Sequence, residues 1–144
     1  MNILRTAQKE EDPKFIEYFF TSERPKEVPP GWKRFPSYPL RFPFPFKFKE
    51  DVEGGYLYIV YRGRIIGYGL IESVEPHQGL QVGSKPPCIG KNVKPGDVVV
   101  IKGPLTRMPF EIACRGFVNF RYIEDNLHEL TFDSAQRVIS KLDL

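Results

Sequence analysis

A strand, a tight turn and a returning strand constrain the fold more than any other feature of the sequence. Residues 56–61 read Tyr-Leu-Tyr-Ile-Val-Tyr, a run of aromatic and β-branched side chains that is typical of a strand. A tight turn follows at 62–64, and residues 65–75 are predicted to return as the second strand of a β-hairpin. Gly67 and Gly69 inside the returning strand predict a bulge, a sharp bend or the close approach of another backbone.

Further short strands are predicted downstream of this hairpin. Residues 98–102 form a continuously apolar run that we expect to be buried on both faces of a sheet. Residues 110–114 and 117–123 are expected to pair with each other, with a turn or bulge at 115–116. The intervening stretch 76–97 is rich in proline and glycine, and it is predicted to be a long loop of the kind that is often functional.

Short helices are predicted near both ends of the chain. A helix is expected over residues 13–20, because Pro13 suits the first helical position. A second helix is expected over residues 134–142, with Asp133 or Ser134 as its cap. These elements predict an α+β fold that is mainly β, a small and partly closed β-barrel with short helices near both termini.

The length and composition narrow the class of protein. The 144 residues fit one domain spanning 1–144, with a barrel core over about residues 30–125. No apolar run reaches the roughly 18–20 residues of a membrane span, and the amino terminus lacks the apolar region of a signal peptide. Cys88 and Cys114 are the only cysteines, which excludes a disulfide scaffold. We therefore expect a cytoplasmic protein without a membrane partner.

Charge, proline and aromatic residues are concentrated in one stretch. The whole chain has a formal net charge of +3, but residues 24–49 hold seven basic side chains and one acidic side chain, a net of +6. The same stretch contains seven prolines and seven aromatic residues. It is too rich in proline for a central strand and too aromatic for a disordered linker, so we expect an ordered loop or edge segment. Its charge favours an anionic partner.

Aromatic and basic residues alternate at the end of that stretch. Residues 41–49 read Arg-Phe-Pro-Phe-Pro-Phe-Lys-Phe-Lys, and an extended chain would place the four rings on one face and the three cations on the other. Such a surface could stack on bases and attract phosphates, as in proteins that bind single strands. The alternative is that the rings fill the barrel interior and the cations remain in water. Burial is the favoured interpretation for the rings.

Two elements of the chain resemble a known superfamily. The first is the returning strand at 65–76, which reads Ile-Ile-Gly-Tyr-Gly-Leu-Ile-Glu-Ser-Val-Glu-Pro. The second is Lys-Pro-Gly-Asp at 94–97, in which proline and glycine form a turn before the valine-rich strand and the aspartate can bond the following backbone. Both resemble elements of PUA-like domains, which include the ASCH and EVE groups. The resemblance covers about residues 55–125 and implies binding of RNA or a modified base, usually without catalysis.

The sequence departs from both of these groups. ASCH domains carry a Gly-x-Lys motif followed by acidic and basic partners, and residues 31–33 match its first part. The following residues 34–36 supply no glutamate, which puts ASCH activity in doubt. EVE domains begin with a strand, whereas a helix is the first element predicted here. The resemblance is therefore to the superfamily and to no particular subgroup.

The candidate nucleic-acid-binding residues are cations and rings placed where they could reach a polyanion. Trp32 lies between a proline-glycine turn and two cations, so it is either a stacking ring for a base or a cap on the barrel end. Arg62 and Arg64 flank the predicted turn, where they either reach phosphates or stay solvated. The full set is Trp32, Lys33, Arg34, Tyr38, Arg41, Lys47, Lys49, Arg62, Arg64, Tyr68, Lys85 and Arg115.

Motifs for catalysis or metal binding are weak. Residues 83–92 resemble a phosphate-binding loop, but their glycines have the wrong spacing and two prolines remove amide donors. The cysteines and histidines lack the paired spacing of a zinc site, and nothing near Cys88 favours a reactive thiolate. We therefore predict no catalytic residue, no metal and no cofactor, and the sequence favours a binding module over an enzyme.

Three functions follow from these observations. The first is a non-catalytic module that binds nucleic acid, with RNA or a modified base as the expected ligand. The second is a protein-interaction or regulatory domain that docks a protein partner, or a second copy of itself, through residues 29–48. The third is an ASCH-type enzyme that acts on a nucleotide or an amide in a barrel pocket, with Lys33 and Tyr68 as the residues to test.

Overall fold

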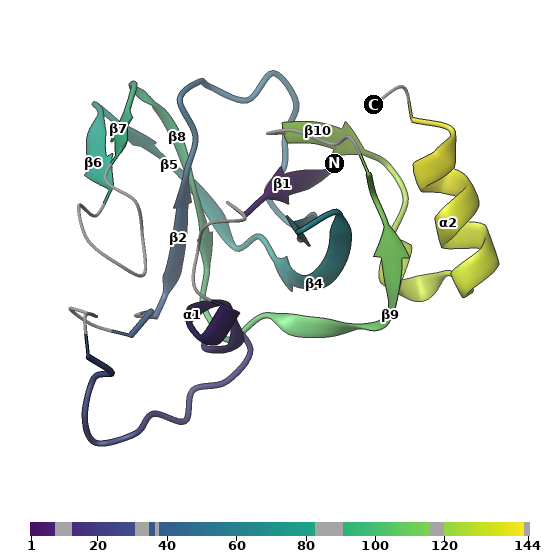
Figure 1. The fold of residues 1–144 in the computed structure, drawn as a ribbon. Helices are drawn as coiled ribbons and strands as arrows, with labels where there is room; N and C mark the ends of the chain where they lie inside the picture. Colours follow the sequence, from purple (N-terminus) through teal and green to yellow (C-terminus); the bar gives the residue numbers. More distant parts are fainter. Residues whose placement is uncertain (8–12, 31–34, 37, 83–90, 116–119, 143–144) are drawn as a thin grey trace.

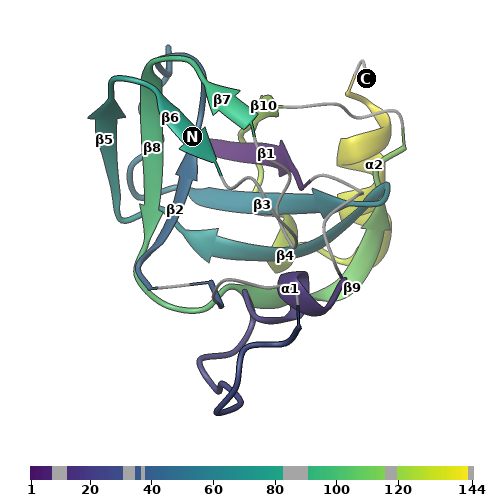
Figure 2. The same ribbon diagram turned by 60° about the vertical axis from the view of Figure 1, so that its left-hand side comes forward.

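Two β-sheets pack face to face with their strands crossing steeply, as Figure 1 and Figure 2 show. The computed structural model describes residues 1–7, 13–30, 35–36, 38–82, 91–115 and 120–142. Its fold is α+β and mainly β, as the sequence predicts. Helix α2 (Phe132–Ser140) covers part of the outer face of the larger sheet (Figure 1), and the short helix α1 (Pro13–Glu17) packs Ile16 into the core between the sheets.

The larger sheet has five strands in the spatial order β10-β1-β3-β4-β9. Its strands are β1 (Asn2–Thr6), β3 (Tyr56–Tyr61), β4 (Arg64–Leu70), β9 (Thr106–Ala113) and β10 (Phe120–Ile123). The smaller sheet has the order β2-β8-β5. Its strands are β2 (Leu40–Pro43), β5 (Ser73–His77) and β8 (Gly96–Ile101). A separate two-stranded ribbon consists of β6 (Leu80–Val82) and β7 (Lys91–Val93).

The strand pairings of the described residues stay within these separate sheets, so they do not confirm a barrel. The larger sheet carries a core on each face. Ile3 and Leu57 face the smaller sheet, whereas Leu4 and Tyr58 face α2. Neither helix in the described ranges is long and apolar enough to cross a membrane.

The first strand of the chain lies inside the larger sheet, which the sequence analysis does not predict. Strand β1 is parallel to β3 and antiparallel to β10. Its residues Ile3 and Leu4 are both fully buried, one on each face, so the strand lacks the alternation of polar and apolar residues that would reveal it. The predicted difference from EVE domains, a helix as the first element, is therefore wrong.

The central hairpin is confirmed. Arg62 and Gly63 form its two-residue turn with φ angles of 51° and 76°, both in the left-handed region that a type I′ turn requires. The predicted bulge is present as a shift of the β4–β9 register between Ile65 and Gly67. A Cβ atom on Gly67 would lie 2.2 Å from the Phe20 ring, so glycine is needed there to let that ring approach.

The returning strand ends earlier than predicted. Strand β4 stops at Leu70, and the chain then passes into the smaller sheet, where it forms β5. The Ile71 N–H donates to the Gly55 carbonyl beside the larger sheet, and the Glu72 N–H donates to the Val100 carbonyl of β8. The predicted single strand over 65–75 is wrong, because these neighbouring residues bond to different sheets.

Three other expectations need correction. Strands β9 and β10 do not pair with each other, because β1, β3 and β4 lie between them in the sheet. Helix α1 ends at Glu17, earlier than predicted. Helix α2 begins at Phe132, and Thr131 caps it by accepting a hydrogen bond from the Ser134 N–H at 3.2 Å. The caps predicted at Asp133 and Ser134 already lie inside the helix.

The phenylalanines at 42–48 are confirmed as core rings. Phe42 and Phe44 are buried, and Phe46 and Phe48 are half-buried. The last three pack with Phe120 of β10, with ring centroids 4.9 to 5.8 Å apart. The segment after β2 thus closes one side of the space between the two sheets.

Gly96 and Asp97 hold that segment in place. The Phe44 N–H donates to the Asp97 carbonyl, and the Asp97 carboxylate accepts a hydrogen bond from the Phe48 N–H at 2.8 Å. A Cβ atom on Gly96 would lie 2.3 to 2.4 Å from backbone atoms of Phe44 and Phe46, so only glycine fits. The Lys-Pro-Gly-Asp element therefore fastens a distant segment, in addition to forming its own turn.

Candidate functional site

Those predicted binding residues that the structure describes do not converge on one cleft. Four of them lie outside the described residues: Trp32, Lys33, Arg34 and Lys85. The other eight lie in four separate places: the loop after α1, the segment from β2 onward, the β3–β4 turn and the outer face of the larger sheet.

Tyr38 is part of the internal structure of the loop that follows α1. Its hydroxyl lies 2.9 Å from the Thr21 carbonyl oxygen and 3.1 Å from that of Tyr18. The Arg24 guanidinium lies over the Tyr38 and Tyr18 rings and donates to the carbonyls of Tyr18, Thr21, Glu23 and Pro36. Through these contacts Tyr38 and Arg24 stabilise the loop. The contacts do not support a base-stacking role for Tyr38.

Arg41, Lys47 and Lys49 lie on or just after β2. A guanidinium nitrogen of Arg41 lies 2.5 Å from a carboxylate oxygen of Glu75 on β5, and both side chains are about half exposed, so solvent weakens this pair. Lys47 and Lys49 are exposed, and the Lys49 N–H donates to the Tyr122 hydroxyl. This segment leads into the start of β3, and the β3–β4 turn lies at the opposite end of that strand. The length of β3, about 20 Å, therefore separates the segment from the turn.

That turn gathers three of the predicted cations. Arg62 lies in the turn, Arg64 begins β4, and Arg115 follows the end of β9. The Cys114 N–H donates to the Gly63 carbonyl at 2.8 Å, which holds the end of β9 against the turn. The Cγ atom of Arg115 lies 3.9 Å from the place that a Cβ on Gly63 would take. We call Arg62, Arg64 and Arg115 the turn arginines, and all three are exposed.

The turn arginines also contact neighbouring side chains. Arg64 forms an ion pair with Glu111 at 2.6 Å, and both side chains are more than half exposed, so solvent weakens the pair. The Arg62 guanidinium carbon lies 5.0 Å from the centroid of the Tyr61 ring. By formal charge alone, the three arginines and Glu111 sum to +2.

Tyr68 belongs to a group of rings on the outer face of the larger sheet. Its ring stacks on the His128 imidazole, with centroids 3.9 Å apart and planes 12° apart. The Tyr56 ring meets the same imidazole edge to face, with centroids 4.5 Å apart. All three side chains are half-buried. We call Tyr56, Tyr68 and His128 the platform. Tyr68 lies on this outer face and not between the sheets. It therefore cannot line the barrel pocket that the enzyme hypothesis requires.

A buried phenol beneath the platform fixes the proton arrangement of His128. The Tyr58 hydroxyl lies 2.8 Å from Nδ1 of His128. Burial raises the pKa of the Tyr58 phenol far above its ordinary value of 10.0, so the phenol keeps its proton. The Glu129 carboxylate lies 3.8 Å from Nε2 and can only accept, so it favours a proton on Nε2 and leaves Nδ1 to accept from the phenol. The imidazole therefore carries its own proton on Nε2.

His128 is neutral in this environment. Loss of hydration lowers the pKa of the imidazole below its ordinary value of 6.5, although the nearby Glu129 carboxylate opposes the shift. The Nε2 atom lies 3.8 Å from Oε1 of Glu129, and Oε2 of the same carboxylate accepts a hydrogen bond from the Asn126 side chain at 3.1 Å. The platform thus presents part of its tyrosine ring surface and one oriented carboxylate, whereas the His128 side chain is only 11% exposed.

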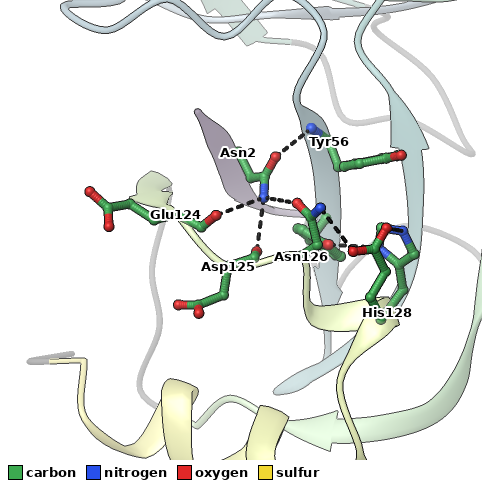
Figure 3. Close-up of polar contacts among 8 residues, drawn as sticks. Asn2, Tyr56, Glu124, Asp125, Asn126 and His128 are labelled. Carbon is green, nitrogen blue, oxygen red and sulfur yellow. Dashed lines mark hydrogen bonds and ion pairs between the residues drawn. The ribbon is translucent and has the colours of Figure 1, made fainter.

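Asn2 positions the connection that carries His128, as Figure 3 shows. Its side chain is buried and accepts a hydrogen bond from the Tyr56 N–H at 2.8 Å. Its Nδ2 group donates to the Asp125 carbonyl at 2.8 Å and to the Asn126 side chain at 2.9 Å. One amide therefore joins β1, β3 and the connection after β10, which fixes the imidazole beside Tyr56.

Sequence reasoning found Tyr68 but missed its neighbours. Tyr56 and Tyr58 alternate with buried residues along β3, and Tyr58 lies directly across from Tyr68 in the hairpin register. Because alternate side chains of a strand point to the same face, the sequence contained a detectable pattern of tyrosines on one face. Nothing in the sequence around His128 indicates its place, because the connection after β10 reaches the hairpin only through tertiary packing.

The described residues offer little for catalysis. They contain no group of three histidine, cysteine or acidic side chains that could hold a metal ion. Burial raises the pKa of the Cys114 thiol to about 11, which disfavours the reactive thiolate. Comparison of the chain with protein-family profiles, curated proteins and solved structures found no match.

Proposed function

We propose that the protein is a non-catalytic nucleic-acid-binding module that contacts the phosphate backbone through the turn arginines. One observation carries the proposal, namely that Arg62, Arg64 and Arg115 come together at the β3–β4 turn with a net positive charge. A guanidinium is the side-chain group that best matches the geometry of phosphate oxygens. Contacts of this kind position a nucleic acid without selecting its sequence.

The expected ligand is RNA, because the resemblance to PUA-like domains implies RNA or modified-base binding. A PUA-like fold with a partly closed barrel is part of the same proposal. The internal contacts of Arg24 and Tyr38 and the burial of Phe42 and Phe44 shift the expected contact surface from residues 24–49 to the turn. Buried rings are also unable to dock a protein partner, which weakens the second hypothesis for that segment.

The test is binding of a short fluorescent single-stranded RNA, measured by anisotropy over a range of salt concentrations. We expect the logarithm of the affinity to fall linearly with the logarithm of salt, by about 0.7 per phosphate contact. A variant with Arg62→Gln, Arg64→Gln and Arg115→Gln should bind more weakly and lose up to about 2 from that slope, because about three contacts disappear.

The matched control is a variant that loses the same net charge at scattered exposed positions, Lys26→Gln, Lys94→Gln and Lys141→Gln. It should keep most of the affinity and the slope of the parent protein. Absence of binding to RNA or DNA at low salt, or equal weakening in both triple variants, would overturn the proposal.

A further inference from the structure

The platform is a surface that the nucleic-acid proposal does not use. Helix α2 covers one part of the outer face of the larger sheet, and the platform lies on the same face. Leu70, directly across from Tyr56 in the hairpin register, is 53% exposed. Aromatic and apolar side chains therefore meet solvent here, although most of this face is buried.

The charge beside the platform is negative. The Glu129 side chain is 60% exposed, and its carboxylate is held near His128 by the hydrogen bond from Asn126. A carboxylate at the edge of ring faces repels a phosphate and attracts a cation, and the faces of tyrosine rings attract cations as well. The ligand that complements both features is a cation that can also lie flat on a ring.

The protein already contains such an arrangement elsewhere. Arg107 lies over the Phe20 ring, with its guanidinium carbon 4.3 Å from the centroid, and it forms an ion pair with Glu17. An arginine thus occupies the space between a ring and a carboxylate. The platform offers the ring and the carboxylate, whereas in the described part of the chain no cation–ring contact involves Tyr56, Tyr68 or His128.

We propose that the platform and Glu129 dock an arginine side chain of a partner protein. The guanidinium lies on the exposed ring surface and donates to the Glu129 carboxylate, a combination that its flat, forked shape allows and an ammonium group does not. The inference is independent of the proposed nucleic-acid function, because the two surfaces share no residue.

The experiment is an NMR titration of the full chain with a short capped peptide that contains one arginine among glycines. A matched peptide carries citrulline, which keeps the shape of the side chain and removes its charge. We expect the arginine peptide to shift the ring resonances of Tyr56, Tyr68 and His128, and the citrulline peptide to bind at least about threefold more weakly, as expected for loss of an exposed cation–ring contact.

Variants separate the rings from general charge. Tyr68→Leu should weaken binding of the arginine peptide by about threefold to tenfold, whereas Tyr68→Phe, which keeps the ring, should not. Glu129→Gln should weaken it by up to about fivefold, as for an exposed ion pair. Glu124→Gln is the matched control, because Figure 3 shows its carboxylate pointing away from His128.

Several outcomes would overturn this proposal. They are equal binding of both peptides, equal weakening by Glu129→Gln and Glu124→Gln, or ring shifts caused by a short single-stranded RNA and not by the arginine peptide. The last result would assign the platform to base stacking. The turn-arginine variant should bind the arginine peptide as the parent does, so failure of either proposal is visible separately.

Discussion

Two clusters of rings lie on opposite faces of the same five-stranded sheet, and they have different roles. The inner cluster comprises Phe44, Phe46, Phe48 and Phe120. These rings carry no polar atoms and fill the space between the two sheets. The outer platform consists of rings that carry polar atoms, rests on a buried phenol and remains in part exposed. Both clusters are aromatic, so ring content alone does not separate a core from a binding surface.

The difference lies in what each cluster leaves to solvent. Burial of an apolar ring stabilises the fold without directing any polar group outward. On the outer face, Tyr58 uses its hydroxyl to fix His128, and the exposed Glu129 carboxylate remains available at the edge. Changes in the inner cluster should therefore alter stability, and changes in the platform should alter binding.

The largest effect is expected in the inner cluster. Phe44→Ala should lower the free energy of unfolding by about 3–5 kcal/mol, because the ring is only 3% exposed and packs against three other rings. Urea denaturation followed by circular dichroism measures this loss. Tyr68→Leu is the control from the outer face, and it should lower the same free energy by less than about 1.5 kcal/mol because its ring is half-exposed. Equal losses would contradict the distinction between the clusters.

A smaller effect is expected from the phenol that supports the platform. Tyr58→Phe should lower the free energy of unfolding by about 1–3 kcal/mol, because Nδ1 of the half-buried His128 loses its hydrogen-bond partner. The same change should raise the pKa of His128, since the neutral imidazole loses the hydrogen bond to Nδ1. NMR titration of the imidazole measures the pKa. An unchanged pKa in this variant would show that Tyr58 does not fix the ring.

Much of the local structure could be predicted from the sequence. The aromatic and β-branched run at 56–61, the turn with Gly63 and the apolar strand β8 each contain a pattern that local physics determines. Burial of the phenylalanines at 42–48 followed from the free energy of burying rings. These predictions hold because neighbours in the chain determine them.

The failures concern contacts between distant segments. Strand β1 has no alternating pattern, and the switch between sheets at Ile71 depends on the strands that receive the chain. From the sequence alone Arg41 was expected to be an exposed cation. In the structure Glu75, 34 residues away in the chain, lies beside it. For the same reason the platform could be found only in part, because His128 reaches Tyr68 through packing that no local pattern encodes.

The smallest effect is the pH dependence that the platform adds to stability. Burial lowers the pKa of folded His128 below its ordinary value of 6.5, so the unfolded chain binds more protons in the window below that pH. The contribution is therefore complete above a pH of about 6.5 and is lost as the pH falls towards the folded pKa, with a slope below about 1.4 kcal/mol per pH unit. The imidazole is faced by the rings of Tyr56 and Tyr68, by the Tyr58 hydroxyl and by the Glu129 carboxylate, which opposes the shift.

Urea denaturation of the parent protein and of His128→Gln, above and below that pH, isolates this contribution. All other titratable groups are present in both proteins and cancel in the difference. We expect the parent to lose more stability than the variant on acidification, because a second proton at Nδ1 would meet the proton that Tyr58 already directs there. A parent protein that instead gains stability relative to His128→Gln would mean that the folded imidazole is charged. The platform would then repel the arginine that we expect it to bind.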